Sequence, residues 1–449
     1  MIMDLKGKKV LVIGLARSGM AAIKVLDRLG AKITLSESKS RSEIKEAEDL
    51  EAIGVEITNQ DMSVFERDFD LVVKNPGVPF RTPMIERLNE RKIKIITEIE
   101  LAYNVAKPQH YVAITGTNGK TTTTSLVYEI LNRAFPGRAH LCGNIGVPLC
   151  ETVLENGLMD EGGHYIALEI SNFQLINIDR FRPEVATIIN LTPDHIDFMG
   201  GLENYYKSKT EIYRNMAGGD VFILNRDDPV LARYVEKYPV KCAVDSFSIE
   251  NENADCFIKD GFITVKGEKV LSVDRVKLVG RHNLQNVIIA VAAAKALGIG
   301  SDVISAAVSS FKGVEHRIEF VREINGVKYY NDSKGTNTDA TVTALKSFDK
   351  GVILLLGGFE KGLAMDDVKR HLGCVKKVIG FGACGPRLVK ELVGDDGIVV
   401  TTLDEAVAEA NKIAKSGDTV LLSPTTSSFD QYTCFEERGE HFKRIVNSL

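Results

Sequence analysis

Short apolar runs alternate with amphipathic segments along most of the chain. The first pair is the run Lys9-Val-Leu-Val-Ile-Gly14 followed by a helical pattern over residues 18–29. Strand-length apolar runs that alternate with helical patterns are typical of parallel sheets covered by helices. Further strands are predicted at residues 32–36, 70–74, 92–97, 111–115, 165–170, 185–191, 221–225, 328–331, 352–356, 377–382, 397–401 and 418–422. The pattern therefore predicts an α/β protein.

Changes in this pattern divide the chain. Pro108 lies at a seam before the strand at 111–115, and a more antiparallel pattern at 257–277 precedes an Ala-rich helix at 283–297. After residue 313 the alternation starts again. A chain of 449 residues also exceeds the size at which one core keeps growing. We expect three domains, over residues 1–107, 108–311 and 312–449.

Composition narrows the class of protein. The apolar content of 44% and charged content of 26% are those of a soluble globular protein, and the net charge of −5 gives no electrostatic reason to expect nucleic acid or an anionic membrane as a partner. The chain begins without the apolar core of a secretory signal, and its apolar runs are too short to span a bilayer. We expect a cytoplasmic location. Seven scattered cysteines without a C-x-x-C pair predict reduced thiols, neither a disulfide frame nor a zinc site.

The most informative segment is Gly116-Thr-Asn-Gly-Lys-Thr-Thr122, which joins the strand at 111–115 to a helical pattern. Glycines at 116 and 119 let backbone N–H groups close around phosphate oxygens, Lys120 supplies a positive charge, and the hydroxyl of Thr121 suits Mg²⁺. The usual loop is G-x4-G-K-[ST], but position 114 is Ile, so this loop is two residues shorter. The segment predicts binding of ATP.

Other polar residues of the central domain follow predicted strands or open a helix. Glu169 ends a strand, where a carboxylate can bind Mg²⁺ or pair with a surface lysine. His195 lies in the loop Thr192-Pro-Asp-His-Ile-Asp197 and suits either a structural hydrogen bond or a metal. The local pattern gives Lys209 only the role of a solvated helix lysine. Asn283 and Asn286 lie three residues apart on one helix face, where they could contact a nucleotide base or cap the helix.

The first domain carries a nucleotide-like turn. Gly14-Leu-Ala-Arg-Ser-Gly19 resembles a dinucleotide fingerprint, but Ala16 replaces the glycine that lets the backbone approach a pyrophosphate. An NAD site is disfavoured relative to a looser nucleotide-diphosphate site. Glu37 ends the second strand, where an acidic residue commonly contacts a ribose; alternatively it caps the loop with Ser36 and Ser38.

These segments together resemble the Mur ligases, the ATP-dependent enzymes that extend the cell-wall peptide on a UDP-sugar. The resemblance covers the whole chain, and its motifs occur in order. They are Gly116-Thr-Asn-Gly-Lys-Thr-Thr122, Gly143-Asn-Ile-Gly146, Glu169-Ile-Ser171, Asn190-Leu-Thr-Pro-Asp-His195, the region of Lys209, Gly280-Arg-His-Asn283 with Asn286, and His316-Arg317. The implied architecture is an N-terminal Rossmann-like UDP-binding domain, a central P-loop ATPase with a mostly parallel sheet, and a C-terminal Rossmann-like domain that binds the amino acid.

The last domain resembles that of the family member that adds D-glutamate. The similar segments are Asn331-Asp-Ser-Lys-Gly-Thr-Asn337, Leu422-Ser-Pro-Thr-Thr-Ser-Ser-Phe-Asp-Gln431 and Phe435-Glu-Glu-Arg-Gly439. The implied reaction phosphorylates the carboxylate of UDP-N-acetylmuramoyl-L-alanine with ATP, and the D-glutamate amine then attacks the acyl phosphate. These two small substrates are the implied partners of a monomer. One departure is Glu37-Ser38-Lys39, where the family more often has Asp-Thr-Arg; lysine would weaken a bidentate phosphate contact.

The resemblance also implies a role for each matching residue. The catalytic set would be Lys120, Glu169, His195 and Lys209. Of two Mg²⁺ ions, one would be held by Thr121 and Glu169, the other by His195 and a carbamylated Lys209. ATP would be bound by Gly116, Thr117, Asn118, Gly119, Lys120, Thr121, Thr122, Asn283, Asn286, Arg317 and Asp332. The UDP-sugar would be bound by Leu15, Ala16, Arg17, Glu37, Ser38, Lys39, Asn75, Gly77 and Asn144. D-Glutamate would be bound by Lys334, Thr336, Lys361, Ser428 and Phe435.

Three other functions stay open at this point. A sister ligase, including folylpolyglutamate synthase, would share the ATP loop but not Asn331-Asp-Ser-Lys334. A nucleotide-sensing binding module would need no second carboxylate-binding domain, so Lys361 and the Ser427-Ser428 segment count against it, unless Lys361 is only a solvated loop residue. A dehydrogenase would bind NAD(H) tightly.

Overall fold

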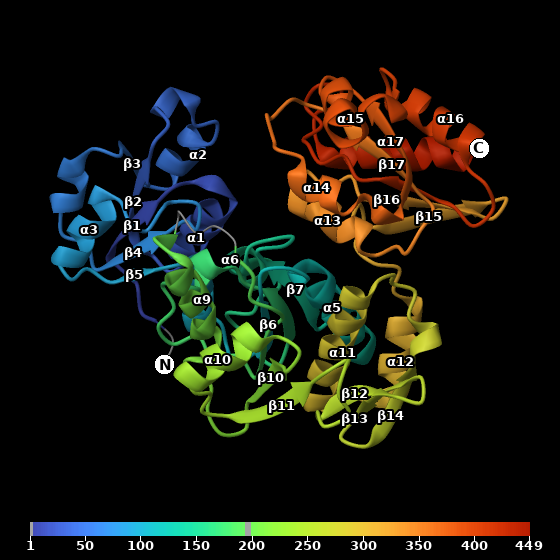
Figure 1. Cartoon of the computed structure of the whole chain (residues 1–449). Coiled ribbons are helices and arrows are strands. Elements are labelled where there is room, and N and C mark those ends of the chain that lie inside the picture. Colours follow the sequence, from blue (N-terminus) through green and yellow to red (C-terminus); the bar gives the residue numbers. More distant parts are fainter. Residues whose placement is uncertain (1–2, 194–198) are drawn as a thin grey trace. The chain divides into compact units, whose positions relative to one another are not determined.

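The structure is a computed structural model that describes residues 3–193 and 199–449 (Figure 1). The chain forms two compact units, one of Met1–Arg275 with Gln285–Ser309 and the other of Val276–Leu284 with Ser310–Leu449. Two sheets lie in the first unit and one in the second. Among the described residues, no helix has both the length and the apolar character needed to cross a membrane.

The first sheet has five parallel strands in the order β3-β2-β1-β4-β5 (Figure 1). β1 (Lys9–Ile13) lies between β2 (Lys32–Glu37) and β4 (Leu71–Lys74), so the strand order reverses beside β1. Ligands of α/β sheets bind at the carboxyl ends of strands at such a reversal. The other elements are α1 (Ala16–Arg28), α2 (Ala47–Ala52), β3 (Glu56–Asn59), α3 (Pro83–Glu90), β5 (Ile95–Ile96) and α4 (Glu98–Val105).

The second sheet has nine strands in the order β14-β13-β12-β11-β10-β9-β6-β8-β7. β6 (His110–Thr115) lies between the parallel strands β8 (Tyr165–Glu169) and β9 (Val185–Ile188). The remaining strands are β7 (Ala139–Gly143), β10 (Val221–Asn225), β11 (Ala243–Phe247), β12 (Cys256–Lys259), β13 (Phe262–Val265) and β14 (Glu268–Ser272). β13 pairs antiparallel with both β12 and β14, which confirms the predicted antiparallel stretch.

Helices connect the strands of this sheet. α5 (Lys120–Ala134) follows β6 directly after the glycine-rich loop, and α9 (Leu202–Thr210) follows β9 in the chain. The predicted Ala-rich helix is α11 (Arg281–Ala296). The other helices are α6 (Leu149–Glu155), α7 (Asn172–Leu175), α10 (Pro229–Lys237) and α12 (Ser301–Ser310).

One apolar core joins the first and second sheets. α1 and α4 pack on α6, and the buried residues around them form a continuous cluster with those of β6 and β8. Two carboxylates of α4 are buried at this contact. Glu100 accepts the backbone N–H groups of Asp179 (3.0 Å), Arg180 (2.8 Å) and Phe181 (3.0 Å), whereas Oε2 of Glu98 accepts the N–H of Cys150 at 2.9 Å.

The third sheet has six strands in the order β15-β16-β20-β17-β18-β19. β16 (Val327–Asn331), β20 (Thr419–Leu422) and β17 (Val352–Gly357) are parallel neighbours, and β15 (Glu319–Ile324) pairs antiparallel at the edge. Alternate residues of β17 belong to two different cores, one under α13 (Thr338–Leu345) and α15 (Gly385–Val393), the other under α16 (Leu403–Ile413) and α17 (Phe435–Ser448). Burial on both faces explains the continuous apolar run of β17. The remaining elements are α14 (Asp366–Arg370), β18 (Val375–Phe381) and β19 (Ile398–Val399).

Candidate active site

The glycine-rich loop follows β6, and its shape depends on two glycines. Gly116 has φ of +152° and Gly119 has φ of +84°. A Cβ on Gly119 would lie 2.5 Å from Oδ1 of Asn286, and one on Gly116 would lie 3.0 Å from Cβ of Ile189. A side chain fits at neither position without displacing these neighbours, so glycine is required at both for this loop conformation.

Polar contacts hold the loop in place. Oδ1 of Asn190, at the end of the β9 segment, accepts the N–H groups of Thr117 (3.2 Å) and Asn118 (2.9 Å). Nζ of Lys120 donates to the carbonyl oxygens of Gly116 (2.9 Å) and Thr117 (2.8 Å), so the ammonium lies over the loop. The structure thus brings the phosphate-binding residues predicted from the local motif into one turn.

Lys209 is buried beside the same loop. Its side chain is 1% exposed, and its Nζ donates to the carbonyl oxygen of Gly116 at 2.9 Å and lies 4.7 Å from the ring centroid of Tyr205. The hydroxyl of Tyr205 in turn lies 3.2 Å from Oγ1 of Thr117. The interpretation of Lys209 as a solvated helix lysine is therefore wrong. Only the tertiary contact of α9 with the loop reveals its position, because its helix also carries Glu203 and Lys207 and nothing in that local sequence distinguishes Lys209 from an exposed lysine.

Glu169 ends β8 next to the loop and is 2% exposed. Its Oε1 accepts Nδ2 of Asn144 at 2.8 Å, whereas Oε2 is buried and has no hydrogen-bond partner within the described parts of the chain. The alternative of a surface acid paired with a lysine is therefore wrong for Glu169. Carboxylate and hydroxyl oxygens are the donors that Mg²⁺ prefers, so this orphaned oxygen and the hydroxyl of Thr121 fit that ion. Oγ1 of Thr115, also buried and unpartnered among the described residues, was missed by sequence reasoning.

Two other predicted residues of the central region, Asn286 and Asn283, have different hydrogen-bond partners. Oδ1 of Asn286 accepts Oγ1 of Thr123 at 3.1 Å, which holds this amide against α5. Asn283 belongs to the other unit, where its Nδ2 donates to the carbonyl oxygen of Val279 at 2.7 Å, before the start of α11. His195 lies outside the described residues.

A cavity of about 620 Å³ opens at the carboxyl ends of the strands in the first sheet. Among the predicted UDP-sugar residues, Leu15, Ala16, Arg17, Glu37 and Lys39 line it, together with further cations at positions 24 and 45 that sequence reasoning missed. Asn144 lies instead in the central domain beside Glu169. Its lining holds three lysines and one arginine together with four glutamates, so individual cations can contact phosphate oxygens although the lining carries no net positive charge.

Glu37 is held by the backbone around it. Its Oε2 accepts the N–H of Leu15 at 2.6 Å, and its Oε1 accepts the N–H (2.8 Å) and hydroxyl (2.9 Å) of Ser38. Burial alone would raise the pKa of Glu37, but these hydrogen bonds outweigh it and lower the pKa. The carboxylate thus caps its own loop through Ser38, as the alternative interpretation expected, but not through Ser36, whose hydroxyl has no partner among the described residues; it also binds the loop after β1 and lines the cavity. Nearby, Oδ1 of Asn75 accepts the N–H of Gly77 at 2.9 Å and shapes the turn after β4.

In the third domain, Asp332 follows β16 and is 3% exposed. Its Oδ2 accepts the hydroxyl of Ser423 at 2.8 Å, and its Oδ1 accepts the N–H of Ile318 at 3.2 Å. Burial raises the pKa of Asp332 to about 7. Arg317 is flanked by His316 and Ile318, which both have positive φ, +61° and +46°. Such backbone strain is commonly stored at functional sites.

The residues predicted to bind an amino acid come from neighbouring strand ends. Nζ of Lys361, in the loop after β17, donates to the carbonyl oxygen of Thr336 in the loop after β16 at 3.2 Å. Nζ of Lys334 lies 5.9 Å from the ring centroid of Phe435, the first residue of α17. Ser428 follows β20, and its hydroxyl is buried without a partner among the described residues. The three strands β16, β20 and β17 are adjacent, so the structure brings these five residues to one edge of the sheet.

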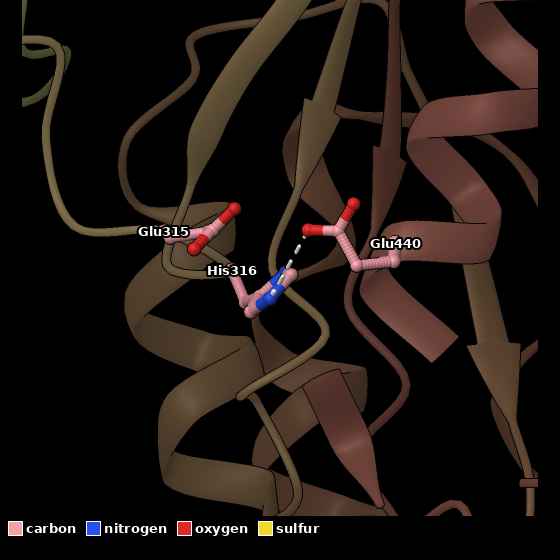
Figure 2. Close-up of side chains that lie close together, drawn as sticks. All are labelled: Glu315, His316 and Glu440. Atoms are coloured by element: carbon pink, nitrogen blue, oxygen red, sulfur yellow. Dashed lines mark ion pairs between the residues drawn. The ribbon is translucent and has the colours of Figure 1, made fainter. Parts of the chain in front are cut away.

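Glu315, His316 and Glu440 form a cluster of potential metal ligands in the same domain (Figure 2). Nε2 of His316 lies 3.8 Å from Oε1 of Glu440, the pair joined by the dashed line in Figure 2. However, Nζ of Lys443 contacts the carboxylates of both Glu315 and Glu440, the latter at 2.7 Å. The single lysine ammonium is shared by these acids and offsets part of their charge, so we interpret the cluster as an ion-pair network that fixes α17 beside His316.

Comparison with protein families accounts for most of the chain. Residues 8–97 match the Mur ligase MurD-like N-terminal domain, residues 114–294 the Mur ligase middle domain, and residues 316–426 the Mur ligase, glutamate ligase domain. The domain boundaries predicted at 107 and 311 stay a prediction, since these matches leave the connecting residues unassigned.

Solved structures show a similar fold. A UDP-N-acetylmuramate-alanine ligase from Thermotoga maritima has a TM-score of 0.57 at 18% identity, over 98% of this chain and 99% of that one. A pseudomurein peptide ligase type C from Methanothermus fervidus has a TM-score of 0.55 at 17% identity, over 98% and 100% of the two chains. These likenesses establish the fold.

Curated relatives are much more similar in sequence. An enzyme of Thermoanaerobacter pseudethanolicus is 43% identical over 100% of both chains, and one of Geobacillus kaustophilus is 39% identical over 98% of both. Each is named UDP-N-acetylmuramoylalanine--D-glutamate ligase. With this identity over the full length and all three family domains in order, the chain belongs to the Mur ligase family, in the group whose curated members bear that name.

Proposed function

We propose that the chain is an ATP-dependent ligase that joins D-glutamate to UDP-N-acetylmuramoyl-L-alanine. The observation that carries this proposal is the full-length similarity to relatives named for that reaction, at 39–43% identity. A phosphate-binding loop in the central domain and a group of cationic and hydroxyl residues at the strand ends of the third domain support it. Both substrates other than ATP are small molecules, and we place the reaction in the cytoplasm with the protein as a monomer.

The chemistry requires an activated carboxylate, because an amine cannot displace oxide from a carboxylate. Transfer of the terminal phosphoryl group of ATP to the alanyl carboxylate gives an acyl phosphate and ADP. The amine of D-glutamate then attacks the carbonyl carbon, the amide forms, and inorganic phosphate leaves with its electron pair while the amine loses a proton. Lys120 would move from its loop carbonyl contacts to the phosphoryl oxygens and stabilise their charge.

Magnesium would be held by Thr121 and Glu169, whose orphaned Oε2 supports this role. When bound, the ion would neutralise phosphate charge and orient the transferring group. We further propose that Lys209 is carbamylated: its neutral amine adds CO₂ and loses a proton, which replaces a cation by an oxygen ligand for a second ion, shared with His195. The burial of Lys209 against the loop, with its Nζ 2.9 Å from the Gly116 carbonyl oxygen, supports a position beside the phosphates.

ATP would also contact residues beyond the loop. Asn286 is held against α5 next to Gly119, and Asp332 and Arg317 lie together in the third domain, where Asp332 suits ribose hydroxyls. The cavity of the first domain, where Arg17 and Lys39 could contact phosphate oxygens, would take the UDP part of the other substrate. Its position at the reversal of strand order supports this assignment.

D-Glutamate would lie over the strand ends of the third sheet. Its two carboxylates need cationic and hydroxyl partners, which Lys334, Lys361 and Ser428 can supply. Phe435 begins a helix of 14 residues, whose first N–H groups favour an anion. Thr336 adds a hydroxyl beside Lys361.

Steady-state kinetics of Lys361→Ala test this placement. We expect KM for D-glutamate to rise by roughly tenfold or more while KM for ATP changes little, because only the amino acid loses a charged partner. Lys369→Ala is the matched control, since Lys369 is an exposed lysine of α14 in the same domain. An unchanged KM for D-glutamate would return Lys361 to the solvated-loop interpretation and weaken the choice of D-glutamate.

A further inference from the structure

We propose that Arg438 is a positioning residue that holds the three loops of the amino-acid site in register. This inference rests on the proposed binding of D-glutamate to those loops. Arg438 lies in the first turn of α17, three residues after Phe435, and its side chain is completely buried. It is the largest fully buried side chain among the described residues.

The guanidinium group contacts the ends of three neighbouring strands. Beyond β16, its Nε donates to Oγ of Ser333 at 3.0 Å and its Nη2 to the carbonyl oxygen of Ser333 at 2.9 Å. Beyond β20, Nη2 also donates to the carbonyl oxygen of Thr426 at 3.1 Å. At the end of β17, Nη1 lies 3.5 Å from the carbonyl oxygen of Gly357. A planar group with five N–H donors suits this geometry, and an ammonium group cannot reproduce it.

Each contacted residue leads directly to a proposed D-glutamate ligand. Ser333 precedes Lys334, and its hydroxyl also donates to the carbonyl oxygen of Phe435 at 2.8 Å. Thr426 lies two residues before Ser428, and Gly357 starts the loop that carries Lys361. Arg438 therefore fixes the backbone from which all of these side chains extend.

The loops pack closely around the guanidinium. Gly358 has φ of +135°, and a Cβ there would lie 3.0 Å from Nη1 of Arg438 and 2.4 Å from the carbonyl oxygen of Ser427. The loops are also joined by backbone bonds, from the N–H of Phe359 to Ser427 (2.9 Å) and from the N–H of Thr425 to Gly335 (2.9 Å). Displacement of the guanidinium would remove the hydrogen bonds that join the three loops.

The charge of Arg438 also points to an anionic ligand. Its hydrogen-bond acceptors among the described residues are neutral oxygens, and the carboxylates of Asp430 and Asp332 act on its charge without forming a direct ion pair. Burial lowers the pKa of Arg438 to about 10, so the group stays charged at neutral pH. A buried cation that no carboxylate contacts directly is costly to keep. A dianionic amino acid bound above these loops would gain from that fixed charge, and the buried hydroxyls of Ser427 and Ser428, which have no partner in the described parts of the chain, would gain an acceptor.

Steady-state kinetics of Arg438→Lys distinguish positioning from a purely structural role. Lysine keeps the charge but lacks the planar guanidinium that donates to several carbonyl oxygens at once. We therefore expect KM for D-glutamate to rise by roughly tenfold or more, with KM for ATP and for the UDP-sugar within about threefold of wild type. Val446→Ala is the control, because Val446 is also fully buried on α17 but packs only in the apolar core. It should lower Tm without a selective change in KM for D-glutamate.

Arg438→Ala with added guanidinium salt gives a second readout. Guanidinium at millimolar concentration should partly restore KM for D-glutamate, whereas methylammonium at the same concentration should not. Equal increases in all three KM values, or no more change in Arg438→Lys than in Val446→Ala, would overturn the proposal.

Hydrogen exchange measures the loops without any substrate, so it separates this inference from the proposed function. When Arg438→Lys and Val446→Ala have lost the same amount of Tm, the backbone amides of segments 333–336, 357–362 and 424–428 should all exchange faster in Arg438→Lys. Unchanged exchange in these segments would overturn the positioning role even in an active ligase. If the rate of the wild-type enzyme did not depend on D-glutamate, the proposed function would be refuted. The exchange rates would then still test the role of Arg438.

Discussion

Single buried charges serve two different purposes in this protein. Lys209 and Glu169 are buried beside the phosphate-binding loop, where each offers a group suited to phosphate or metal chemistry. Glu98 is buried in the core between the first two sheets, where its Oε1 has no hydrogen-bond partner among the described residues. We therefore expect the first two to control activity and Glu98 to affect stability.

Replacement of Lys209 tests whether the residue is a metal ligand. Lys209→Ala should be nearly inactive, and short carboxylic acids should partly restore its rate by supplying the missing oxygen ligand. Lys209→Arg should also be inactive, because a guanidinium group neither adds CO₂ nor binds Mg²⁺. Rates of phosphate release with and without acetate measure this. An active Lys209→Arg enzyme would show that only a positive charge beside Gly116 is needed.

Glu98→Gln should stabilise the protein at high pH. Burial raises the pKa of Glu98 from 4.5 to about 7, so the folded state holds a proton that the unfolded state releases, and stability falls as pH rises from 4.5 to 7. Glutamine cannot ionise. Above pH 7 it should therefore increase the free energy of unfolding by at most about 3 kcal/mol, with little difference below pH 4.5.

Urea denaturation of both proteins at pH 5 and pH 8 measures this difference. Glu155→Gln is the control, because Glu155 is an exposed acid of the neighbouring helix α6. A gain of equal size at both pH values would show that ionisation of Glu98 is not the cause.

Among the elements, the start of α5 is the most constrained. Gly119 precedes the helix with φ of +84° and faces the amide of Asn286, which in turn holds Thr123. Gly119→Ala would add both backbone strain and a steric overlap, 2.5 Å from Cβ to Oδ1. We expect KM for ATP to rise by roughly tenfold or more, since the loop would shift from the phosphates.

Gly137→Ala provides the matched control for this variant. Gly137 lies just after the other end of α5 with a similar φ of +75°, but a Cβ there would meet nothing within 4 Å. It should cost about 1–2 kcal/mol of stability through backbone strain alone, without a change in KM for ATP. Equal KM values for the two variants would show that the contact with Asn286 does not shape the loop.

The sequence predicts the central strands better than the edges. β1, β6 and β17 are buried on both faces, so their sequences are continuous apolar runs. β3 and β15 lie at sheet edges and have mixed polar and exposed residues, so the sequence pattern does not reveal them. β7 and β11 are also missed, because their composition is mixed. The strands predicted at 92–97 and 397–401 shrink to two residues each, β5 and β19, because the flanking residues form turns.

In the site, too, local motifs can be predicted from the sequence, whereas contacts between distant residues cannot. The phosphate-binding loop is a local motif, so its residues are visible in the sequence. The burial of Lys209 and the contacts of Arg438 arise from residues 93 and up to 105 positions away in the chain, which no local pattern records. The sequence could not decide between the two roles of Glu37, because one of its partners, Leu15, is brought to it only by the parallel pairing of β1 with β2.

In the whole molecule, the proposed machinery is divided between two compact units. The phosphate-binding loop, Lys209 and the cavity beside Glu37 belong to the first unit, and the amino-acid loops with Asp332 belong to the second. Neither unit holds all of the residues that we propose for the reaction. Full activity should therefore require the intact chain and all three substrates.

The choice of amino acid separates this enzyme from its sister ligases. A panel of amino acids at fixed ATP and UDP-N-acetylmuramoyl-L-alanine should give phosphate release with D-glutamate. L-Alanine, diamino acids and dipeptides should give only the background rate, because the loops after β16, β17 and β20 offer partners for two carboxylates.

The decisive measurement is the initial rate of phosphate release with UDP-N-acetylmuramoyl-L-alanine, ATP and either D-glutamate or L-glutamate. We predict release that requires all three substrates, equals the amount of amide product, and is supported by the D enantiomer but not the L enantiomer. Phosphate release without an amino acid, or at the same rate with both enantiomers, would contradict the assignment of the chain as a D-glutamate ligase.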